Sequence, residues 1–366
     1  MYKRQLKREG FEVCLLDCLA ERIDTPELLE RVKEFDPDLI FSEISTVSLK
    51  NDLAILSKLK DYPLAIGGAD FNIRTPEFLK NHPFLDFILV GEYEVTLWEL
   101  SENLRKGKNG EGVKGLIFRE KNNQVKVNSP RPLLKDLDWL PWPLREELPM
   151  EKYIDAPGGL PIPSCQMWTS RGCPFQCIFC AWPQLMYGGN RFRARDPRKV
   201  VDEMEFLIKK MHFQSIYIDD DTTNVGKSRM KKLAQEILRR GLKFPWAIMA
   251  RPDLMDEEVL EILREAGLHS VKYGVESASQ EILNKANKRM DLKKAERMVR
   301  FTKELGIKTH LTFTFGLPGE TKETIKKTID LALSLNPDSL QFSIATPFPG
   351  TSFYEEMKKK GFILTE

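Results

Sequence analysis

The alternation of short apolar runs with amphipathic runs over residues 164–366 constrains the fold of this chain more than any other feature. Six apolar runs have the length and composition of strands, and a run with helical periodicity follows each of them. The predicted strands are Gln166–Ser170, Ser215–Asp219, Trp246–Ala250, Ser270–Val275, Thr309–Phe315 and Ser339–Ile344. The predicted helices lie near residues 198–210, 227–240, 256–266, 291–305, 321–334 and 352–360. Six βα units favour an α/β fold with an open, partial (β/α)6 barrel of the TIM type over another flat sheet.

A second alternation occupies residues 1–105 and predicts a doubly wound, Rossmann-like domain. Its predicted strands are Phe11–Leu16, Asp38–Phe41, Leu64–Ile66 and Asp86–Val90. Its predicted helices are Pro26–Phe35, Leu49–Leu59 and Glu94–Arg105. Short, continuous apolar strands between helices indicate a parallel sheet that is covered on both faces.

Residues 106–163 differ from both alternating regions. Gly115–Val127 has the pattern of a hairpin, and Pro130–Pro163 contains eight prolines with little periodicity. Proline-rich segments of this kind commonly connect domains. We therefore expect a first domain over residues 1–105, a hairpin and linker over 106–163, and the barrel over 164–366.

Charge and hydropathy exclude several classes of protein. The chain has 56 basic and 54 acidic side chains, a formal net charge of +2, which argues against nucleic-acid binding driven by bulk charge. No apolar run approaches the roughly 20 residues that cross a bilayer. The N-terminal segment is basic but has no apolar stretch typical of a secretory signal. We expect a cytoplasmic protein without a transmembrane segment and without a nucleic-acid partner.

Three of the six cysteines lie within eight residues, in the order C-x3-C-x2-C, just after the first predicted strand of the barrel. They are Cys173, Cys177 and Cys180. Thiolates in this pattern indicate iron or zinc. A structural zinc site needs a fourth Cys or His nearby, and an electron-transfer cluster normally takes four cysteines. Neither fourth ligand is present at such a spacing, so three ligands would leave one iron with an open position for chemistry.

This motif, followed by the six-unit barrel, resembles the radical S-adenosylmethionine superfamily. The resemblance implies a 4Fe–4S cluster on the three cysteines, with its open iron chelated by S-adenosylmethionine. It implies that a reductase, flavodoxin or ferredoxin supplies an electron, and that cleavage of the cofactor gives a 5′-deoxyadenosyl radical. The aromatic residue before the last cysteine, Phe179, is expected to pack near the adenine.

Segments at the carboxyl ends of later strands are similar to matching family segments, and active sites of such barrels form at these ends. The resemblance implies that Glu276 holds S-adenosylmethionine and that Arg289 reaches the carboxylate of this cofactor. It implies that a turn formed by Gly316, Pro318 and Gly319 lies against the methionine and adenine moieties. Asp220 is expected to face substrate or cofactor.

Structural alternatives remain open for these residues. The glycines could simply make a turn, and the acidic triplet containing Asp220 could be a solvated loop or a helix N-cap. Glu276 is harder to explain structurally, because burial of a lone carboxylate is costly.

The order of sheet, proline-rich linker and barrel resembles the cobalamin-binding branch of the superfamily. The segment Leu6–Val13, which usually follows the first strand of the branch, lies almost at the N-terminus here, so the first strand is expected to be absent. The chain also stops without the C-terminal helical region usual in the branch, so both ends look clipped. Candidate cobalamin contacts are Ser42, Ser45, Gly67, Gly68, Gly91 and Glu92, although glycines at strand ends equally suit plain βα turns.

The first functional hypothesis is cobalamin-linked methyl transfer or ring modification on an unactivated carbon. Residues 180–184 and 188–193 resemble members associated with hopanoid lipid and tetrapyrrole pathways, which suggests a small-molecule, lipid-like, isoprenoid or tetrapyrrole-like substrate. The alternatives are a radical methylthiotransferase acting on transfer RNA or protein, a non-enzymatic iron–sulfur electron carrier, and an inactive fragment or binding module.

Overall fold

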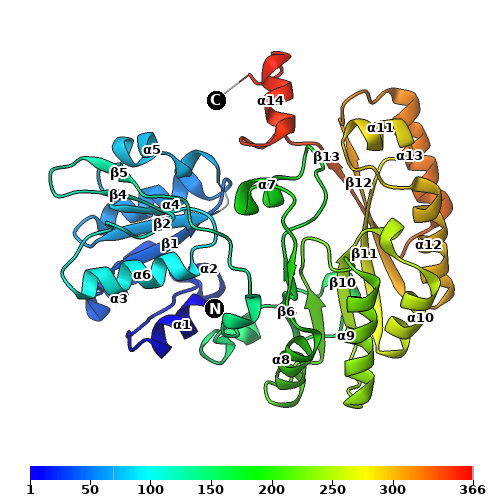
Figure 1. Cartoon of the computed structure of the whole chain (residues 1–366), viewed down its shortest axis with the longest axis horizontal. Helices are drawn as coiled ribbons and strands as arrows, with labels where there is room; N and C mark the ends of the chain where they lie inside the picture. Colours follow the sequence, from blue (N-terminus) through cyan, green and yellow to red (C-terminus); the bar gives the residue numbers. More distant parts are fainter. Residues whose placement is uncertain (69, 365–366) are drawn as a thin grey trace. The chain divides into compact units, whose positions relative to one another are not determined.

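The structure is a computed structural model of the chain, and it describes residues 1–68 and 70–364. The chain forms two compact units. The first contains Met1–Lys135, Trp139–Lys152 and Leu185–Tyr187, and the second contains Asp136–Asp138, Tyr153–Gln184 and Gly188–Glu366. Each unit is built around its own sheet (Figure 1).

The first unit contains a five-stranded sheet in the order β1-β2-β3-β4-β5. The strands are β1 (Ile40–Ile44), β2 (Leu64–Gly68), β3 (Phe87–Leu89), β4 (Leu116–Arg119) and β5 (Val125–Val127). The first three pair in parallel, and the β4–β5 hairpin joins β3 in antiparallel orientation. The parallel part confirms the predicted doubly wound character, because helices connect its strands.

The helices of this unit are α1 (Tyr2–Arg8), α2 (Cys18–Glu21), α3 (Thr25–Phe35), α4 (Leu49–Leu56), α5 (Pro76–Asn81) and α6 (Glu94–Arg105). The local sequence explains where several of these helices begin. The side chains of Asp24 and Thr75 accept backbone N–H groups in the first turns of α3 and α5, and both helices have proline in that turn. Two apolar clusters cover the sheet, one containing Leu6, Phe87 and Leu97 and the other Leu64 and Ile88.

Two features of the first unit differ from the sequence prediction. Phe11–Leu16 is not a strand, although Phe11 and Val13 pack against the core. In a doubly wound sheet of order 2-1-3, the first strand would lie between this segment and β1, and no such strand exists among the described residues. An extended segment without a neighbour cannot form a ladder. The predicted hairpin, assigned to the linker, instead extends the sheet through β4.

The second unit contains six parallel strands in the order β13-β12-β11-β10-β9-β6. They are β6 (Ser164–Met167), β9 (Ser215–Ile218), β10 (Trp246–Ala250), β11 (Leu268–Glu276), β12 (Lys308–Phe315) and β13 (Ser339–Ile344). Two short strands, β7 (Ser170–Arg171) and β8 (Arg193–Ala194), form a separate antiparallel pair. Within the described residues β6 and β13 do not pair, so this is the open, partial barrel that the sequence predicts.

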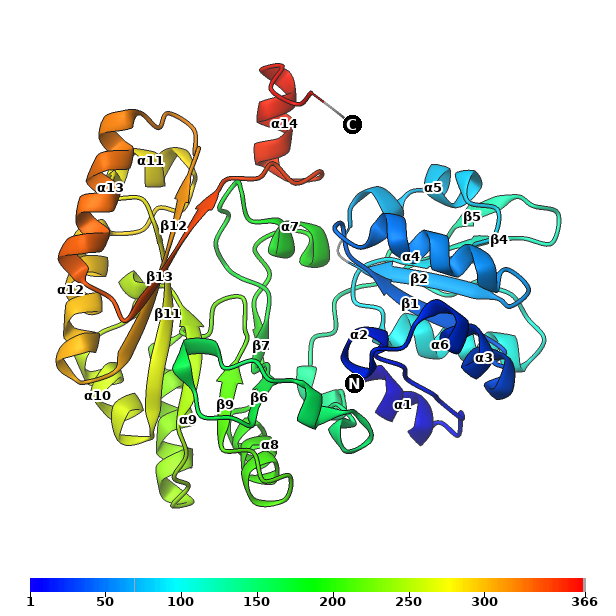
Figure 2. The ribbon, with the colours of Figure 1, turned by 180° about the vertical axis from the view of Figure 1, so that it is seen from behind.

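The helices of the second region are α7 (Ala181–Tyr187), α8 (Pro197–Lys209), α9 (Lys227–Arg239), α10 (Glu257–Glu265), α11 (Gln280–Lys285), α12 (Leu292–Glu304), α13 (Lys322–Leu335) and α14 (Ser352–Lys359). Figures 1 and 2 show α9, α10, α12 and α13 along one side of the sheet. Side-chain N-caps start many of them, namely Asp196, Asp256, Ser279, Asp291, Thr321 and Thr351.

Alternate residues of β11 point to opposite faces. The Tyr273 hydroxyl shares a hydrogen bond of 2.9 Å with Thr302 of α12, so Tyr273 faces the helices. Its neighbours in sequence therefore face the inside of the barrel, which we call the lumen. At the amino end of the strands, Leu160 packs against Tyr217 and Ala247 and forms the floor of the lumen.

In the described part of the chain, no helix is both long enough and apolar enough to cross a membrane.

Candidate active site

The three clustered cysteines lie on one loop between β7 and α7, near the carboxyl ends of the barrel strands. Cys180 is the N-cap residue of α7, Cys173 is buried, and Cys177 and Cys180 are partly buried. Each of the other two thiols raises the pKa of Cys180, so the three sulfur atoms share one small region. The structure therefore brings together the residues that the spacing predicted as ligands.

The acidic segment after β9 fastens the start of this loop. The Asp220 carboxylate accepts hydrogen bonds from the backbone N–H and the hydroxyl of both Thr169 and Ser170, at 2.5 to 3.0 Å. Asp221 accepts the N–H of Gly172 at 2.7 Å, one residue before the first cysteine. The predicted residue Asp220 thus acts through the backbone that leads into the loop, where the structure gives it no free carboxylate oxygen to offer a ligand.

The far side of the loop is fastened by Gln184 of α7. Its side-chain amide donates to the carbonyl of Cys180 at 2.6 Å and to that of Cys177 at 3.2 Å. Its carbonyl oxygen accepts the N–H of Ser352, the first residue of α14, at 3.2 Å. Gln184 therefore joins the cysteine loop to the segment that follows the last strand.

A third attachment comes from the segment after α11. The N–H of Ile178 donates to the carbonyl of Ala286 at 3.1 Å, and the Asn287 side chain donates to the carbonyl of Gln176 at 2.8 Å. The loop is therefore held by hydrogen bonds to other parts of the unit at or next to each of its three cysteines.

Cationic side chains lie close to the cysteines. Burial raises the pKa of the Cys177 thiol, and the charges of Lys288 and Arg251 partly oppose that rise. Arg251 also lies 3.7 Å from the centre of the Phe175 ring, in the cysteine loop, and it pairs with Asp253. These charges favour thiolates and other anionic groups at the site.

The pKa of Cys180 is raised to about 12, first by burial and then by the neighbouring thiols and Asp221. Without a metal, this thiol is protonated at neutral pH. Iron binding must therefore displace protons, as expected for any thiolate site.

Glu276 ends β11 in the left-handed region, with φ of 70°, beside a bulge in its pairing with β12. Its carboxylate is buried, where it pairs with Lys288 at 2.9 Å and accepts the Thr314 hydroxyl at 2.8 Å. The ion pair with Lys288 and the hydrogen bond from Thr314 together fix the direction of the carboxylate. Lys288 is the cation that pairs with this carboxylate, whereas Arg289 is exposed, and the predicted contact of Arg289 with the carboxylate of S-adenosylmethionine stays a prediction.

An apolar cluster lies next to the last cysteine. Phe179 and Ala345 pack against Ile282, Ala286 and Leu317. Leu317 belongs to the predicted turn, in which Gly316 and Gly319 both have φ above 80° and Pro318 lies between them. An apolar cluster next to the last cysteine is consistent with the predicted adenine contact of Phe179, which stays a prediction.

The residues present fit an iron–sulfur cluster. Three thiols gather on one loop beside cationic side chains, with no fourth cysteine or histidine there among the described residues. In the same residues, no three His, Cys, Asp or Glu side chains close around one point as they would around a single ion. A cluster needs no such closure, because each thiolate binds a different iron.

The predicted cobalamin contacts of the first unit lie in or just after β1, β2 and β3. A Cβ added to Gly68 would lie 2.0 Å from the Ile44 carbonyl oxygen, so packing alone requires that glycine, whereas a Cβ at Gly67 would lie 3.1 Å from the Phe41 ring and would need only a small shift of it. Gly91 has φ of 81° and open space beside it. Ligand approach is therefore easiest at Gly91.

Two of the polar candidates in the same unit, Ser45 and Glu92, have hydrogen-bond partners within it. Ser42 lies within β1, and the Ser45 hydroxyl shares a hydrogen bond of 2.8 Å with Ser48 at the start of α4. The Glu92 carboxylate accepts the N–H of Leu134 at 3.1 Å and so fastens the linker to the end of β3. Their roles toward cobalamin stay predictions.

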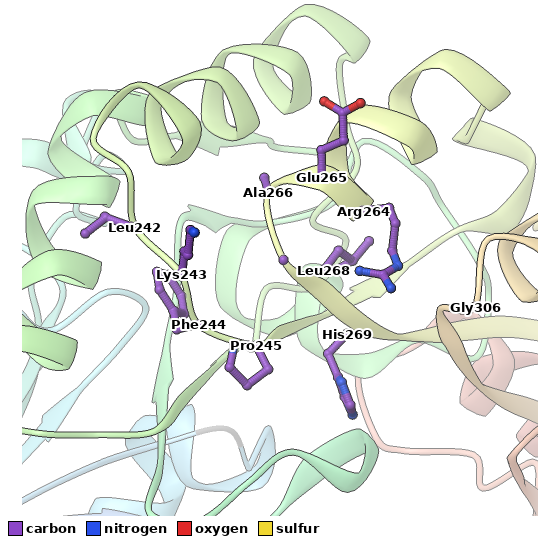
Figure 3. Close-up of a pocket in the computed structure, with 11 residues that line it drawn as sticks. Leu242, Lys243, Phe244, Pro245, Arg264, Glu265, Ala266, Leu268, His269 and Gly306 are labelled. Atoms are coloured by element: carbon purple, nitrogen blue, oxygen red, sulfur yellow. The ribbon is translucent and has the colours of Figure 1, made fainter.

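A cavity of about 430 Å³ lies at the opposite, amino end of β10 and β11, bordered by Lys243, Arg264 and His269 among others (Figure 3). Barrel enzymes perform their chemistry at the carboxyl ends of the strands. We therefore do not assign the reaction to this cavity.

Comparison with known proteins tests the family. The profile of the radical SAM superfamily matches residues 168–332, and that of the B12 binding domain matches residues 1–101. An uncharacterized methyltransferase of Pyrococcus horikoshii is 32% identical over 100% of this chain and 79% of its own length. The chain belongs to the radical SAM superfamily. The radical SAM profile and the B12 binding profile together identify a cobalamin-dependent radical SAM enzyme, which confirms the expected 4Fe–4S cluster, S-adenosylmethionine and cobalamin.

Two further similarities place this radical SAM enzyme within its superfamily. It is 29% identical to the anaerobic magnesium-protoporphyrin IX monomethyl ester cyclase of Rubrivivax gelatinosus, over 97% of this chain and 65% of the relative. It matches the solved structure of TsrM, a radical S-adenosylmethionine methyltransferase from Kitasatospora setae with tryptophan and a cofactor analogue bound. The TM-score is 0.81 at 25% identity, over 97% of this chain and 71% of that chain. The methylthiotransferase and electron-carrier alternatives are not favoured.

Sequence reasoning missed several residues that position the site of this radical SAM enzyme: Gln184, Arg251, Asn287, Lys288 and Thr314. None belongs to a motif of unusual composition. The one signal in the sequence was the pattern L-x-x-x-x-K over Leu283–Lys288, which resembles a family segment and ends at Lys288.

Proposed function

We propose that this radical SAM enzyme transfers a methyl group to an unactivated carbon of a small organic substrate in a cobalamin-dependent reaction. The observation that carries the proposal is a three-cysteine loop, fixed at the carboxyl ends of a partial barrel, in a chain that also has a B12-binding domain. When bound, the cluster supplies the electron that cleaves S-adenosylmethionine, and cobalamin carries the methyl group.

The residues of the barrel have distinct tasks in this proposal. Cys173, Cys177 and Cys180 hold the cluster and leave one iron for the cofactor. Glu276, with its direction set by Lys288 and Thr314, accepts hydrogen bonds from the polar groups of S-adenosylmethionine. A pre-oriented acceptor loses no free energy to reorganisation when the ligand binds.

The apolar surface of the site binds the flat part of the cofactor. Phe179 and Leu317 pack in one cluster, and adenine has the size and apolar faces to cover it. The turn from Gly316 to Gly319 contains Leu317, so its backbone lies close to this cluster. Its two glycines have positive φ values that residues with a Cβ rarely adopt.

We infer that the substrate is a small molecule with an extended apolar part, of the lipid, isoprenoid or tetrapyrrole type. Support comes from the resemblance of residues 180–184 and 188–193 to enzymes of such substrates, and from a relative named for a magnesium-protoporphyrin ester. A flavodoxin, ferredoxin or reductase is the proposed electron donor.

The test is anaerobic reconstitution with iron and sulfide, followed by reduction in the presence of S-adenosylmethionine and methylcobalamin. We expect the wild type to bind about four irons, as a 4Fe–4S cluster requires, and to release 5′-deoxyadenosine. Cys177→Ala is expected to lose both, whereas Cys14→Ala, an exposed cysteine outside the loop, keeps both. A wild type that assembles the cluster but leaves S-adenosylmethionine intact would refute the proposal.

A further inference from the structure

A row of side chains crosses the barrel below the cofactor site. The strand register aligns Met249 of β10 with Lys272 of β11, Lys272 with His310 of β12, and His310 with Ser339 of β13. Because neighbouring residues in register point to the same face of a sheet, these four share one face.

That face is the lumen, as contacts above and below the row establish. Two residues before Lys272, the Ser270 side chain faces Gly158 in the segment that closes the floor. Two residues after it, a Cβ on Gly274 would lie 2.7 Å from the Glu276 carboxylate and 3.1 Å from the Lys288 ammonium. Alternation along β11 then places Lys272 in the lumen between these levels.

The level of Lys272 is close to the proposed cofactor contact. A strand advances about 3.3 Å per residue, so Lys272 lies about 7 Å below Gly274 and the Glu276 carboxylate beside it. A group held at Lys272 therefore lies within the length of a small molecule from the reaction.

The lumen is open to solvent at this level. Met249, Lys272 and His310 are each partly exposed, and Ser339 is exposed. In a closed barrel the same positions are filled by packed side chains. The polar row is therefore a surface on which a ligand can bind.

Lys272 has no built-in counterion within hydrogen-bonding distance. In residues 1–68 and 70–364, its ammonium forms no hydrogen bond and no ion pair. Its charge acts at longer range on Asp219, at the end of β9, and on His310. Asp219 lies two strands away, with β10 between them.

Next to the lysine, His310 supplies a second polar contact. Its Nδ1 shares a hydrogen bond of 2.8 Å with the Ser339 hydroxyl, which fixes the ring and leaves Nε2 for another partner. An ammonium beside an oriented imidazole is a common arrangement for binding a negatively charged oxygen group.

We propose that Lys272, assisted by His310, binds an anionic oxygen group of the substrate, a carboxylate or a phosphonate, inside the barrel lumen. This assignment rests on the proposed function and narrows its substrate class to amphipathic anions. The charged group lies at the Lys272 level, and the apolar remainder extends toward the cysteine loop.

The experiment is equilibrium dialysis of the full chain, reconstituted anaerobically with its cluster, against three probes. The probes share the same hydrocarbon part and differ only in their polar end group. The probes are 4-phenylbutanol, 4-phenylbutyrate and 4-phenylbutylphosphonate. We expect the wild type to bind one of the two anions about fivefold or more tightly than the alcohol, the size of a partly desolvated charge interaction. The anion that is preferred identifies the carboxylate or the phosphonate as the group that fits.

Three variants test whether Lys272 causes the preference for the anion over the alcohol. Lys272→Gln is expected to abolish the preference for the anion, and Lys272→Arg to retain it. Lys327→Gln, on the exposed surface of α13, removes the same charge from elsewhere and is expected to match the wild type. An unchanged preference in Lys272→Gln, or none in the wild type, overturns the proposal.

The radical chemistry of the proposed function is measured separately on the same protein samples. Iron content and 5′-deoxyadenosine release by the wild type and by Lys327→Gln report on the radical chemistry. If these fail while Lys272 still governs the dialysis result, the proposed function is wrong and the anion site is not. If they succeed and the dialysis preference is absent, only the anion site is refuted.

Discussion

Asp220 illustrates how a single side chain can govern a site that it does not enter. Its two carboxylate oxygens accept four hydrogen bonds from Thr169 and Ser170, and Arg229 lies 3.7 Å away. Hydrogen bonds to a buried charge are among the stronger ones in proteins. The path of the chain into the cysteine loop therefore depends on this carboxylate.

Asp220→Asn tests that dependence. The amide retains one acceptor but turns an NH2 group toward donors, so we expect a loss of about 3 kcal/mol in the free energy of unfolding. We also expect less iron per chain after reconstitution. Urea unfolding and iron analysis are the measurements. The control is Asp155→Asn, an exposed carboxylate, and equal stability of the two variants would contradict the interpretation.

The neighbours Lys288 and Arg289 offer a second test at this scale. Lys288→Gln leaves the buried Glu276 carboxylate without its cation, which is expected to cost about 3 kcal/mol or more. Arg289→Gln changes an exposed side chain and is expected to stay within about 0.5 kcal/mol of the wild type. Denaturant unfolding of the cluster-free protein compares them directly. A larger loss in Arg289→Gln than in Lys288→Gln would show that Lys288 is not the cation that stabilises the buried Glu276.

At the residue scale, the cysteines could be predicted from sequence because their spacing is local and thiols have few other uses in this pattern. Gln184 and Asn287 could not be predicted, because their importance depends on carbonyl groups that tertiary folding brings to them. The same holds for Thr314, which lies 38 positions from Glu276 in the chain.

At the scale of elements, helices α8 and α9 are joined by an ion-pair network. Arg240, just after α9, contacts Asp202 of α8 at 2.7 Å and Glu236 of α9 at 2.8 Å. Hydrogen bonding from Arg239, together with that from Arg240, lowers the pKa of Glu236 to about 2. The network therefore depends on an ionised Glu236.

This network predicts a pH dependence. Because the pKa of Glu236 is lower in the folded chain, its stabilising effect is complete above the ordinary pKa of 4.5 and is lost as the pH falls toward 2. Glu236→Gln removes the effect at every pH. We expect the difference in urea midpoint between wild type and variant to be full at pH 6, to shrink as the pH falls below 4.5, and to be small at pH 2. A difference that does not change with pH would contradict this account.

The elements also show where sequence patterns stop being sufficient. Periodicity predicted six strands of the barrel because each apolar run is bounded by turns. Phe11–Leu16 has an equally good strand pattern, but a strand exists only where a neighbour completes its hydrogen bonds, and local sequence does not contain that information. For the same reason, the hairpin was visible in the sequence whereas its pairing with β3 was not.

For the whole molecule, the two units provide separate supports for two cofactors. The cysteines and their attachments lie in the second unit, and the B12 binding domain matches residues 1–101 of the first. Each unit has its own sheet and its own apolar core. We therefore expect the first unit to fold without the cluster.

We accordingly expect the triple variant Cys173→Ala/Cys177→Ala/Cys180→Ala to lose iron but to retain hydroxocobalamin with an affinity within about threefold of the wild type, a difference of less than 1 kcal/mol. Absorbance after gel filtration measures retention, and titration measures affinity. Glu92→Gln, which weakens the contact between β3 and the linker, is the matched variant in the first unit. Loss of cobalamin from the cysteine variant would show that the cluster also organises the first unit.

The hydrogen bonds that attach the cysteine loop have a consequence for what happens when the cluster is lost. Asp221, Gln184 and Asn287 hold the loop through bonds that contain no iron. Small zinc domains behave differently, since they unfold when their metal leaves. We therefore expect the loop to keep its shape when the cluster is lost, so that iron and sulfide can rebuild the cluster without refolding of the chain.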